Sequence, residues 1–275
     1  MKLIIFSALA AAAAAQTPDV GTIMENVGRN QAQAVALRQE FTFHQKQLLR
    51  LHRGNGRVAR EEHREYDVTP VGNGVDKALL RFDGRYEHKG KYITYDHPGY
   101  TYKDMDIDGE LIDDLSSDMT NDQHSRDGIS ANLFPLTPNE QDKYTFKLLG
   151  TQQYRGRQVH RVAFEPKPHQ EEEAAWKGEA LIDAAEFQPV SVHSSLALKI
   201  PAAVKVLLGT DIKGLGFSVT YQKFEDGVWF PVCYGGEFEV RAVFFYKRTI
   251  SVNMTNTEFQ RTRVNSSVTY LANEK

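Results

Sequence analysis

The sequence predicts a mainly β protein with few helices, built on a curved, meandering antiparallel sheet of about ten strands. Apolar and polar residues alternate over 144–148, as they do in a half-buried strand. The alternation returns over 158–164, 178–183 and 189–192, and turn-forming residues separate these segments. Aromatic residues make up 11% of the chain, with 15 Phe and 12 Tyr, and they favour strands.

The overall charge excludes one class of partner. The chain of 275 residues has a net charge of −3, whereas a nucleic-acid-binding protein needs a basic surface to replace phosphate counterions. The length permits either one large domain or two small ones.

The first fifteen residues predict a targeting segment. Lys2 gives a positive start, residues 3–15 are apolar, and small alanines precede Gln16. Such a short stretch does not span a bilayer, which takes about 20 residues. A cleaved secretory signal peptide over 1–15 is therefore favoured over an apolar N-terminal helix that stays in place. No cysteine lies near the cleavage site, which argues against a lipid anchor.

A helix is expected to open the mature chain. Thr17 offers a capping hydroxyl and Pro18 suits the first helical position. Four apolar residues then recur at helical spacing, namely Val20, Ile23, Met24 and Val27. The pattern blurs near Gly28, which leaves a break in the helix open.

Strands follow the helix. Residues 40–53 predict a long strand, and a Gly-Asn-Gly turn returns the chain into a strand over 57–69. This second strand is polar on both faces, which predicts either an edge strand or a wall of a hydrated groove. After a turn at 72–74, a strand is expected over 78–82, and Asp83-Gly84 predicts another turn.

The segment 104–127 is strongly acidic. It carries nine acidic residues against one arginine, Arg126, and predicts a mobile loop or an insertion. Asp104, Asp106 and Asp108 match the first half of a calcium-binding loop, but its twelfth position is Leu115 rather than a carboxylate. A solvated acidic loop is therefore favoured over a calcium site.

The C-terminal half continues the strand pattern. A short helix is expected over 201–208 and a strand over 217–224. Gly235-Gly236 predicts a turn between strands at 228–234 and 237–250. A final strand is expected over 253–264.

Taken in order, these motifs resemble a known superfamily. FTFHQKQ and GNGRVAREEHREYDVTP are followed by YTFKLLG, YRGRQVHRVAFEPK, WKGEALID, GLGFSVTY and EDGVWFP. The pattern resembles the outer-membrane lipoprotein-sorting (LolA/LolB-like) superfamily, in particular its uncharacterised periplasmic branch. The resemblance implies a curved, incomplete antiparallel β-barrel with helices packed across the open concave face. It also favours a single domain over 16–275.

The residues offer no catalytic set. His63 and His193 have no matching partners for zinc binding or nucleophilic catalysis, and His160 is expected to be a packed core histidine. No enzyme activity, resident metal or cofactor is predicted. Cys233 is the only cysteine and is expected to be a small buried apolar residue. The candidate lining of a ligand cavity is a set of strand aromatics: Phe43, Phe82, Phe146, Phe164, Phe217, Trp229 and Phe244.

The leading functional hypothesis is a periplasmic binding or carrier protein in the cell envelope. Its ligand would be a lipid, an acyl chain or a lipoprotein, with transient membrane contact during transfer. The alternative is an envelope sensor or scaffold that uses the same fold to bind a partner protein. Both rest on the resemblance and the targeting segment.

Overall fold

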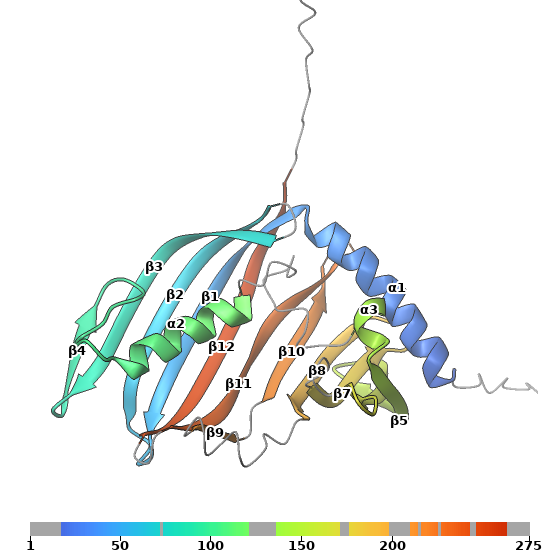
Figure 1. The fold of residues 1–275 in the computed structure, drawn as a ribbon. Helices are drawn as coiled ribbons and strands as arrows, with labels where there is room; N and C mark the ends of the chain where they lie inside the picture. The colour runs from blue at the N-terminus through green and yellow to red at the C-terminus, as the bar shows by residue number, and fades with distance from the viewer. Residues whose placement is uncertain are drawn as a thin grey trace, which may run out of the picture.

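The computed structural model describes residues 18–71, 74–120, 136–170, 176–197, 210–213, 216–224, 227–242 and 246–262. Within these residues, twelve strands form one antiparallel sheet that is open rather than closed on itself (Figure 1). The predicted signal peptide over 1–15 and the predicted helix over 201–208 lie outside the described residues.

The first group of strands follows the N-terminal helix in sequence and extends from the middle of the sheet to one edge. It comprises β1 (Phe41–Arg53), β2 (Val58–Val71), β3 (Gly74–His88) and β4 (Lys91–Tyr95). The second group comprises β5 (Tyr144–Tyr154), β6 (Arg157–Pro166), β7 (Trp176–Asp183), β8 (Pro189–Leu196), β9 (Thr210–Lys213), β10 (Gly216–Lys223), β11 (Trp229–Ala242) and β12 (Tyr246–Arg261).

The strand order is β4-β3-β2-β1-β12-β11-β10-β8-β7-β6-β5, and β9 pairs with β11 beside this path. The prediction of a curved antiparallel sheet with few helices is confirmed. The first and last strands, β1 and β12, are neighbours in the interior of the sheet. The two edges are β4 and β5.

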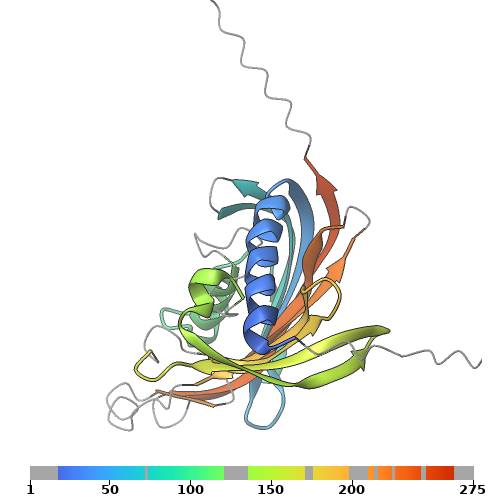
Figure 2. The same ribbon diagram turned by 90° about the vertical axis from the view of Figure 1, so that its right-hand side faces the viewer.

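Helix α1 (Val20–Arg38) is one unbroken helix, so the possible break near Gly28 is not observed. It begins two residues later than Thr17 suggested, because Asp19 caps it by accepting a hydrogen bond from the backbone N–H of Thr22. Asn30 donates to the carbonyl oxygen of Glu186 at 2.7 Å, and Arg38 donates to that of Trp229 at 2.9 Å. The helix therefore bridges the β7–β8 connection and β11 across the open side of the sheet (Figure 2).

Two shorter helices complete the described fold. α3 (Pro138–Gln141) is tied to α1, because Gln141 donates to the carbonyl oxygen of Met24 at 3.0 Å. α2 (Ile107–Thr120) lies against β1 and β2 (Figure 1). Residues 107–120 are thus helical, and the prediction of a loop over 104–127 is wrong for this part. Residues 121–127 lie outside the described residues.

Two of the predicted turns, at Asp83-Gly84 and at Gly235-Gly236, are wrong. β3 continues through Asp83-Gly84, where an added Cβ would lie 2.3 Å from the Tyr95 ring. β11 continues through Gly235-Gly236, where added Cβ atoms would lie about 2 Å from backbone oxygens of neighbouring strands. These glycines permit close approach in the sheet instead of reversing the chain. As a result, the three strands predicted over 228–234, 237–250 and 253–264 are two, because β11 continues to Ala242 and β12 runs from Tyr246 to Arg261.

The strand β2 is neither an edge strand nor the wall of a hydrated groove. It lies between β1 and β3, and Arg60 and Glu62 are 0% exposed. Its polar residues are buried because they pair with one another and with α2, which sequence periodicity alone does not reveal.

Candidate functional site

The concave face of the sheet is the candidate site. Side chains from α1, α2 and most of the strands form one buried apolar cluster on this face. Ile23 and Val27 of α1 and Ile112 of α2 are fully buried in it. No described helix is both long enough and apolar enough to cross a membrane.

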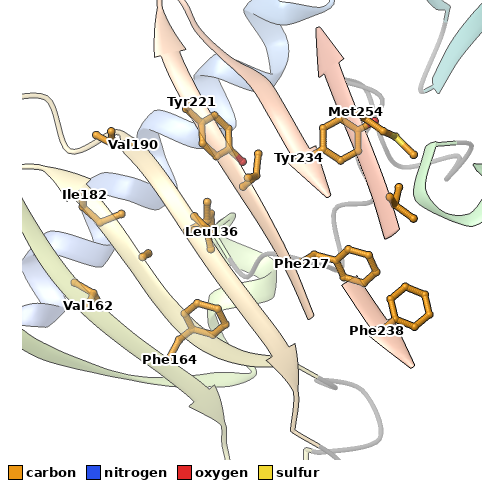
Figure 3. Close-up of a cluster of buried hydrophobic side chains, with 14 of the residues drawn as sticks. Leu136, Val162, Phe164, Ile182, Val190, Phe217, Tyr221, Tyr234, Phe238 and Met254 are labelled. Carbon is orange, nitrogen blue, oxygen red and sulfur yellow. The ribbon is translucent and has the colours of Figure 1, made fainter. Parts of the chain in front are cut away.

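An aromatic floor lies in the middle of this face, and we define it as Phe164, Phe217, Tyr234 and Phe238. Figure 3 shows these rings, which come from β6, β10 and β11, among the buried apolar residues. The rings of Phe217 and Phe238 are 6.1 Å apart, centroid to centroid, and pack edge to face. Trp176 contacts Phe217 in the same geometry at 5.6 Å. Aromatic contacts therefore connect β7, β10 and β11 across this face, and Phe164 adds a ring from β6.

The structure brings together part of the predicted aromatic set. Phe146, Phe164, Phe217 and Trp229 all contribute to the main cluster. Phe43 lies instead beside Phe259, at a ring distance of 5.4 Å, and Phe82 lies beside Tyr95 at 5.6 Å. Phe244 lies outside the described residues.

Next to the apolar floor runs a chain of buried amides. Gln47 donates to Gln45 at 2.8 Å, and Gln45 donates to Asn256 at 3.0 Å and to the Tyr234 hydroxyl at 3.1 Å. Ser116 of α2 donates to Gln47 at 2.8 Å. Because buried amides must keep hydrogen-bond partners, this chain fixes the position of α2 on β1.

A charged cluster holds the start of α2 to the sheet. Arg60 donates to Asp106 at 2.7 Å, to the Tyr95 hydroxyl at 2.6 Å and to the carbonyl oxygen of Tyr100 at 2.6 Å. Burial opposes its charge, but Tyr95, Glu62 and Asp106 outweigh this effect and raise the pKa of Arg60. The guanidinium therefore stays charged and fully paired.

Two more aspartates of the acidic segment bind arginines. Asp108 accepts two hydrogen bonds from Arg248, both at 2.9 Å, and a third from the Tyr246 hydroxyl at 2.8 Å. Asp113 pairs with Arg64, which also pairs with Glu62. The acidic residues thus bind three arginines on two strands, β2 and β12, and we call these contacts the α2 latch.

Both interpretations of the acidic motif are corrected by the latch. Asp106 is buried against Arg60 and Asp108 is bound to Arg248, so both carboxylates are paired with arginines and neither is free to bind calcium. α2 begins at Ile107, inside the segment that a calcium loop would occupy, and Asp104 is exposed. Among the described residues, no group of three or more His, Cys, Asp or Glu could hold a metal ion.

Lys77 was not singled out from the sequence. Its Nζ atom is buried and has no hydrogen-bond partner in the described part of the chain. It lies 5.9 Å from the centre of the Tyr66 ring. Burial, followed by repulsion from Arg64, lowers the pKa of Lys77 to about 7. Lys77 thus places a buried amine without a counterion on the concave face of the sheet.

Replacing Lys77 with methionine is expected to raise the free energy of unfolding by on the order of 2 kcal/mol at pH 6. The folded pKa is about 7, whereas an unfolded lysine titrates near 10.5. Between these values the unfolded chain holds one proton more, so the native protein gains stability as pH rises and the advantage of the variant fades. Urea unfolding from pH 6 to 9 measures this.

The matched control is Lys147→Met, which removes an exposed lysine on β5. We expect no pH-dependent gain in that variant. A loss of stability at pH 6 in Lys77→Met would contradict the burial of an unpaired amine.

Other predicted residues have ordinary environments. His160 is 4% exposed and stacks on Phe187, and burial lowers its pKa, so the core-histidine prediction is confirmed. Cys233 is only half-buried, which corrects the prediction of a buried residue. It lines a hollow of about 280 Å³ with polar neighbours, including Ser218 and Thr220, whose positions alternate with the buried Phe217 and Val219. This hollow is on the face opposite the aromatic floor.

The protein is thus an open antiparallel sheet whose concave face carries aromatic residues and is covered by helices that ion pairs and hydrogen bonds hold in place. No protein-family model and no curated protein matches the sequence. Solved structures similar to it include the following three. An outer membrane lipoprotein-sorting protein domain from Vibrio parahaemolyticus is 11% identical, with 89% of this chain and 93% of that chain covered and a TM-score of 0.35.

The other two structures are similar to the same degree. A LolA superfamily protein from Nitrosomonas europaea is 10% identical, with coverage of 90% and 94% and a TM-score of 0.36. A DUF1329 family protein from Desulfovibrio piger is 11% identical, with coverage of 91% and 96% and a TM-score of 0.36. These matches include the superfamily that the sequence motifs resemble. Likeness at this level does not define a ligand or an activity.

Proposed function

We propose that the protein is a periplasmic carrier that binds a lipid, an acyl chain or the acyl chains of a lipoprotein in the cell envelope. The observation that carries the proposal is the aromatic floor, which strands distant in sequence build on the concave face. Burial of an acyl chain on such a surface contributes about 0.8 kcal/mol per methylene group. The binding is passive and requires no covalent step.

The α2 latch supports a route for the ligand. Arg248 and Asp108 are 15% and 17% exposed at their side chains, so water reaches this pair. When these charged groups separate, water or a polar ligand group can take the place of the lost partner. Apolar side chains that separate gain no comparable contact. In this proposal α2 loosens at the Asp108–Arg248 pair to admit the chain and then closes over it, while the buried contacts of Arg60 and Gln47 keep the helix on the sheet.

Tryptophan fluorescence tests the carrier proposal directly. The chain has two tryptophans, so Trp229→Phe leaves Trp176 as the only one, with its ring against Phe217 of the floor. Titration of this variant with palmitate is expected to change the Trp176 emission in a saturable way. The converse variant, Trp176→Phe, reports from Trp229, which donates to Glu186 at 3.1 Å, and is expected to change little.

Two further measurements decide the proposal. Lipid should co-purify with the protein from its native host and appear in an organic extract. A fluorescent fatty acid should bind and be displaced by the unlabelled acid. Absence of extractable lipid together with absence of displacement would sink the carrier proposal.

A second candidate function is recognition of an envelope protein. The edge strand β4 exposes Tyr92 at 46% and Ile93 at 40%, and an edge strand with exposed apolar residues can accept a strand from a partner. Capture of a specific envelope protein that is lost in Ile93→Lys, without any bound lipid, would favour this function over the carrier.

A further inference from the structure

We propose that Lys77 binds the anionic head group of the ligand, so that the protein selects acyl chains that end in a carboxylate or a phosphate. This inference rests on the proposed carrier function and names the class of ligand. It is carried by the position of one amine relative to an apolar row on the same face of the sheet.

The first step is the orientation of Lys77. Lys77 is the direct cross-strand partner of Val68, which in turn is the partner of Phe43. Side chains of directly paired residues lie on one face, so the three residues form a row across β3, β2 and β1. Val68 is 0% exposed and Phe43 is 6% exposed, and Phe43 contacts Phe259 at 5.4 Å. A row of buried apolar side chains therefore adjoins the amine.

The second step is the charge balance around Lys77. The neighbouring cation, Arg64, is already paired with the carboxylates of Glu62 and Asp113. Neither carboxylate is therefore left to pair with Lys77. The Lys77 amine has no hydrogen-bond partner in the described residues. It lies near the face of the Tyr66 ring. A buried amine in this state is costly unless an anion joins it. An incoming head group would supply that anion.

The third step is the chemistry of the ligand. The amine adjoins apolar side chains on one side and Leu79, which is 43% exposed, lies two residues away along β3. A small hydrated anion gains nothing from Val68 and Phe43, whereas an acylated anion places its head on Lys77 and its tail along the row. The structure thus favours a molecule that carries both groups.

A displacement assay tests this inference on the full chain. The probe is a fluorescent fatty acid, and the competitors are palmitate, palmityl alcohol, palmitoyl lysophosphatidate and monopalmitoylglycerol. We expect each anionic lipid to compete about 10- to 100-fold better than its neutral counterpart, the range that a charge-assisted hydrogen bond contributes. Acetate and inorganic phosphate are expected not to compete.

The variants separate the inference from the carrier proposal. Lys77→Met should remove the preference for anionic lipids and leave the affinity for neutral lipids unchanged, while Lys147→Met keeps the preference. Equal binding of anionic and neutral lipids by the native protein overturns the inference and leaves the carrier function standing. Competition by acetate or phosphate at the level of the lipids overturns the requirement for an acyl chain. Failure of every lipid to bind overturns both.

Discussion

Replacing Arg60 with methionine lowers the free energy of unfolding by about 3–5 kcal/mol, the cost of breaking a buried ion pair from one side. Arg60 is 0% exposed and is bound by Glu62 and Asp106, whose side chains are 0% and 1% exposed. Without the guanidinium, two carboxylates remain buried with less positive charge. Urea unfolding at pH 7, followed by far-ultraviolet circular dichroism, gives the value.

The control is Arg81→Met on the neighbouring strand. Arg81 pairs with Asp83 at 2.7 Å, but the two side chains are 66% and 57% exposed, so the loss should stay below about 1 kcal/mol. Comparable losses in the two variants would show that Arg60 is not the centre of the cluster. Adding Asp106→Leu to Arg60→Met is expected to recover part of the loss, because one unpaired carboxylate is removed.

Replacing Gly236 with alanine is the second change with a large expected effect, a loss of about 3 kcal/mol. The added Cβ would lie 2.0 Å from the carbonyl oxygen of Gly216 on the neighbouring strand β10. Backbone atoms of a paired strand cannot move away without breaking the sheet, so β10 and β11 must separate locally. Thermal and urea unfolding measure the loss of stability.

Gly54→Ala is the matched control for this change. An added Cβ there meets only the Lys247 side chain, at an ordinary 3.7 Å, and the stability should change by less than about 1 kcal/mol. If Gly236→Ala were as stable as Gly54→Ala, the chain would have to turn at Gly236, as the sequence pattern first indicated.

Periodicity predicted the strands well where each has one buried face. The strands β5 to β8 begin and end within a few residues of the predicted segments, because apolar residues alternate clearly there. Gly84 and the Gly235-Gly236 pair failed as turn signals, whereas Gly54-Asn55-Gly56 does turn the chain between β1 and β2. A missing side chain serves a tight turn and a close strand contact equally well. At Gly236 the role is a close strand contact, because the carbonyl oxygen of Gly216 lies where a side chain would begin.

The charged half of the fold could not be predicted from local sequence. Arg60 and Asp106 are partners across 46 positions, and nothing near either residue indicates the other. A strand with buried charges and a helix with many acids each look solvated when considered alone. Their complementarity becomes visible only when both lie on the same face.

The candidate site was partly predictable for a related reason. Phe164 and Phe217 lie in strands whose alternation places them inward, and both reach the aromatic floor. Lys77 was missed because the register of β2 and β3 shifts between Glu65 and Tyr66. Counting back from Phe82 by twos places Lys77 on the outer face, whereas the shift turns it to the inner one.

The pairing of β1 with β12 also determines when the protein can fold. β12 is the only strand that joins the four strands β1–β4 to the rest of the sheet in the described residues, and its pairing with β1 begins between Phe41 and Arg261. Each part can form hairpins during synthesis, but the two cannot be united before β12, which pairs with β1 from Arg248 onward, has been made. The union of the two parts therefore depends on contacts between residues distant in sequence, which makes this step of folding slow.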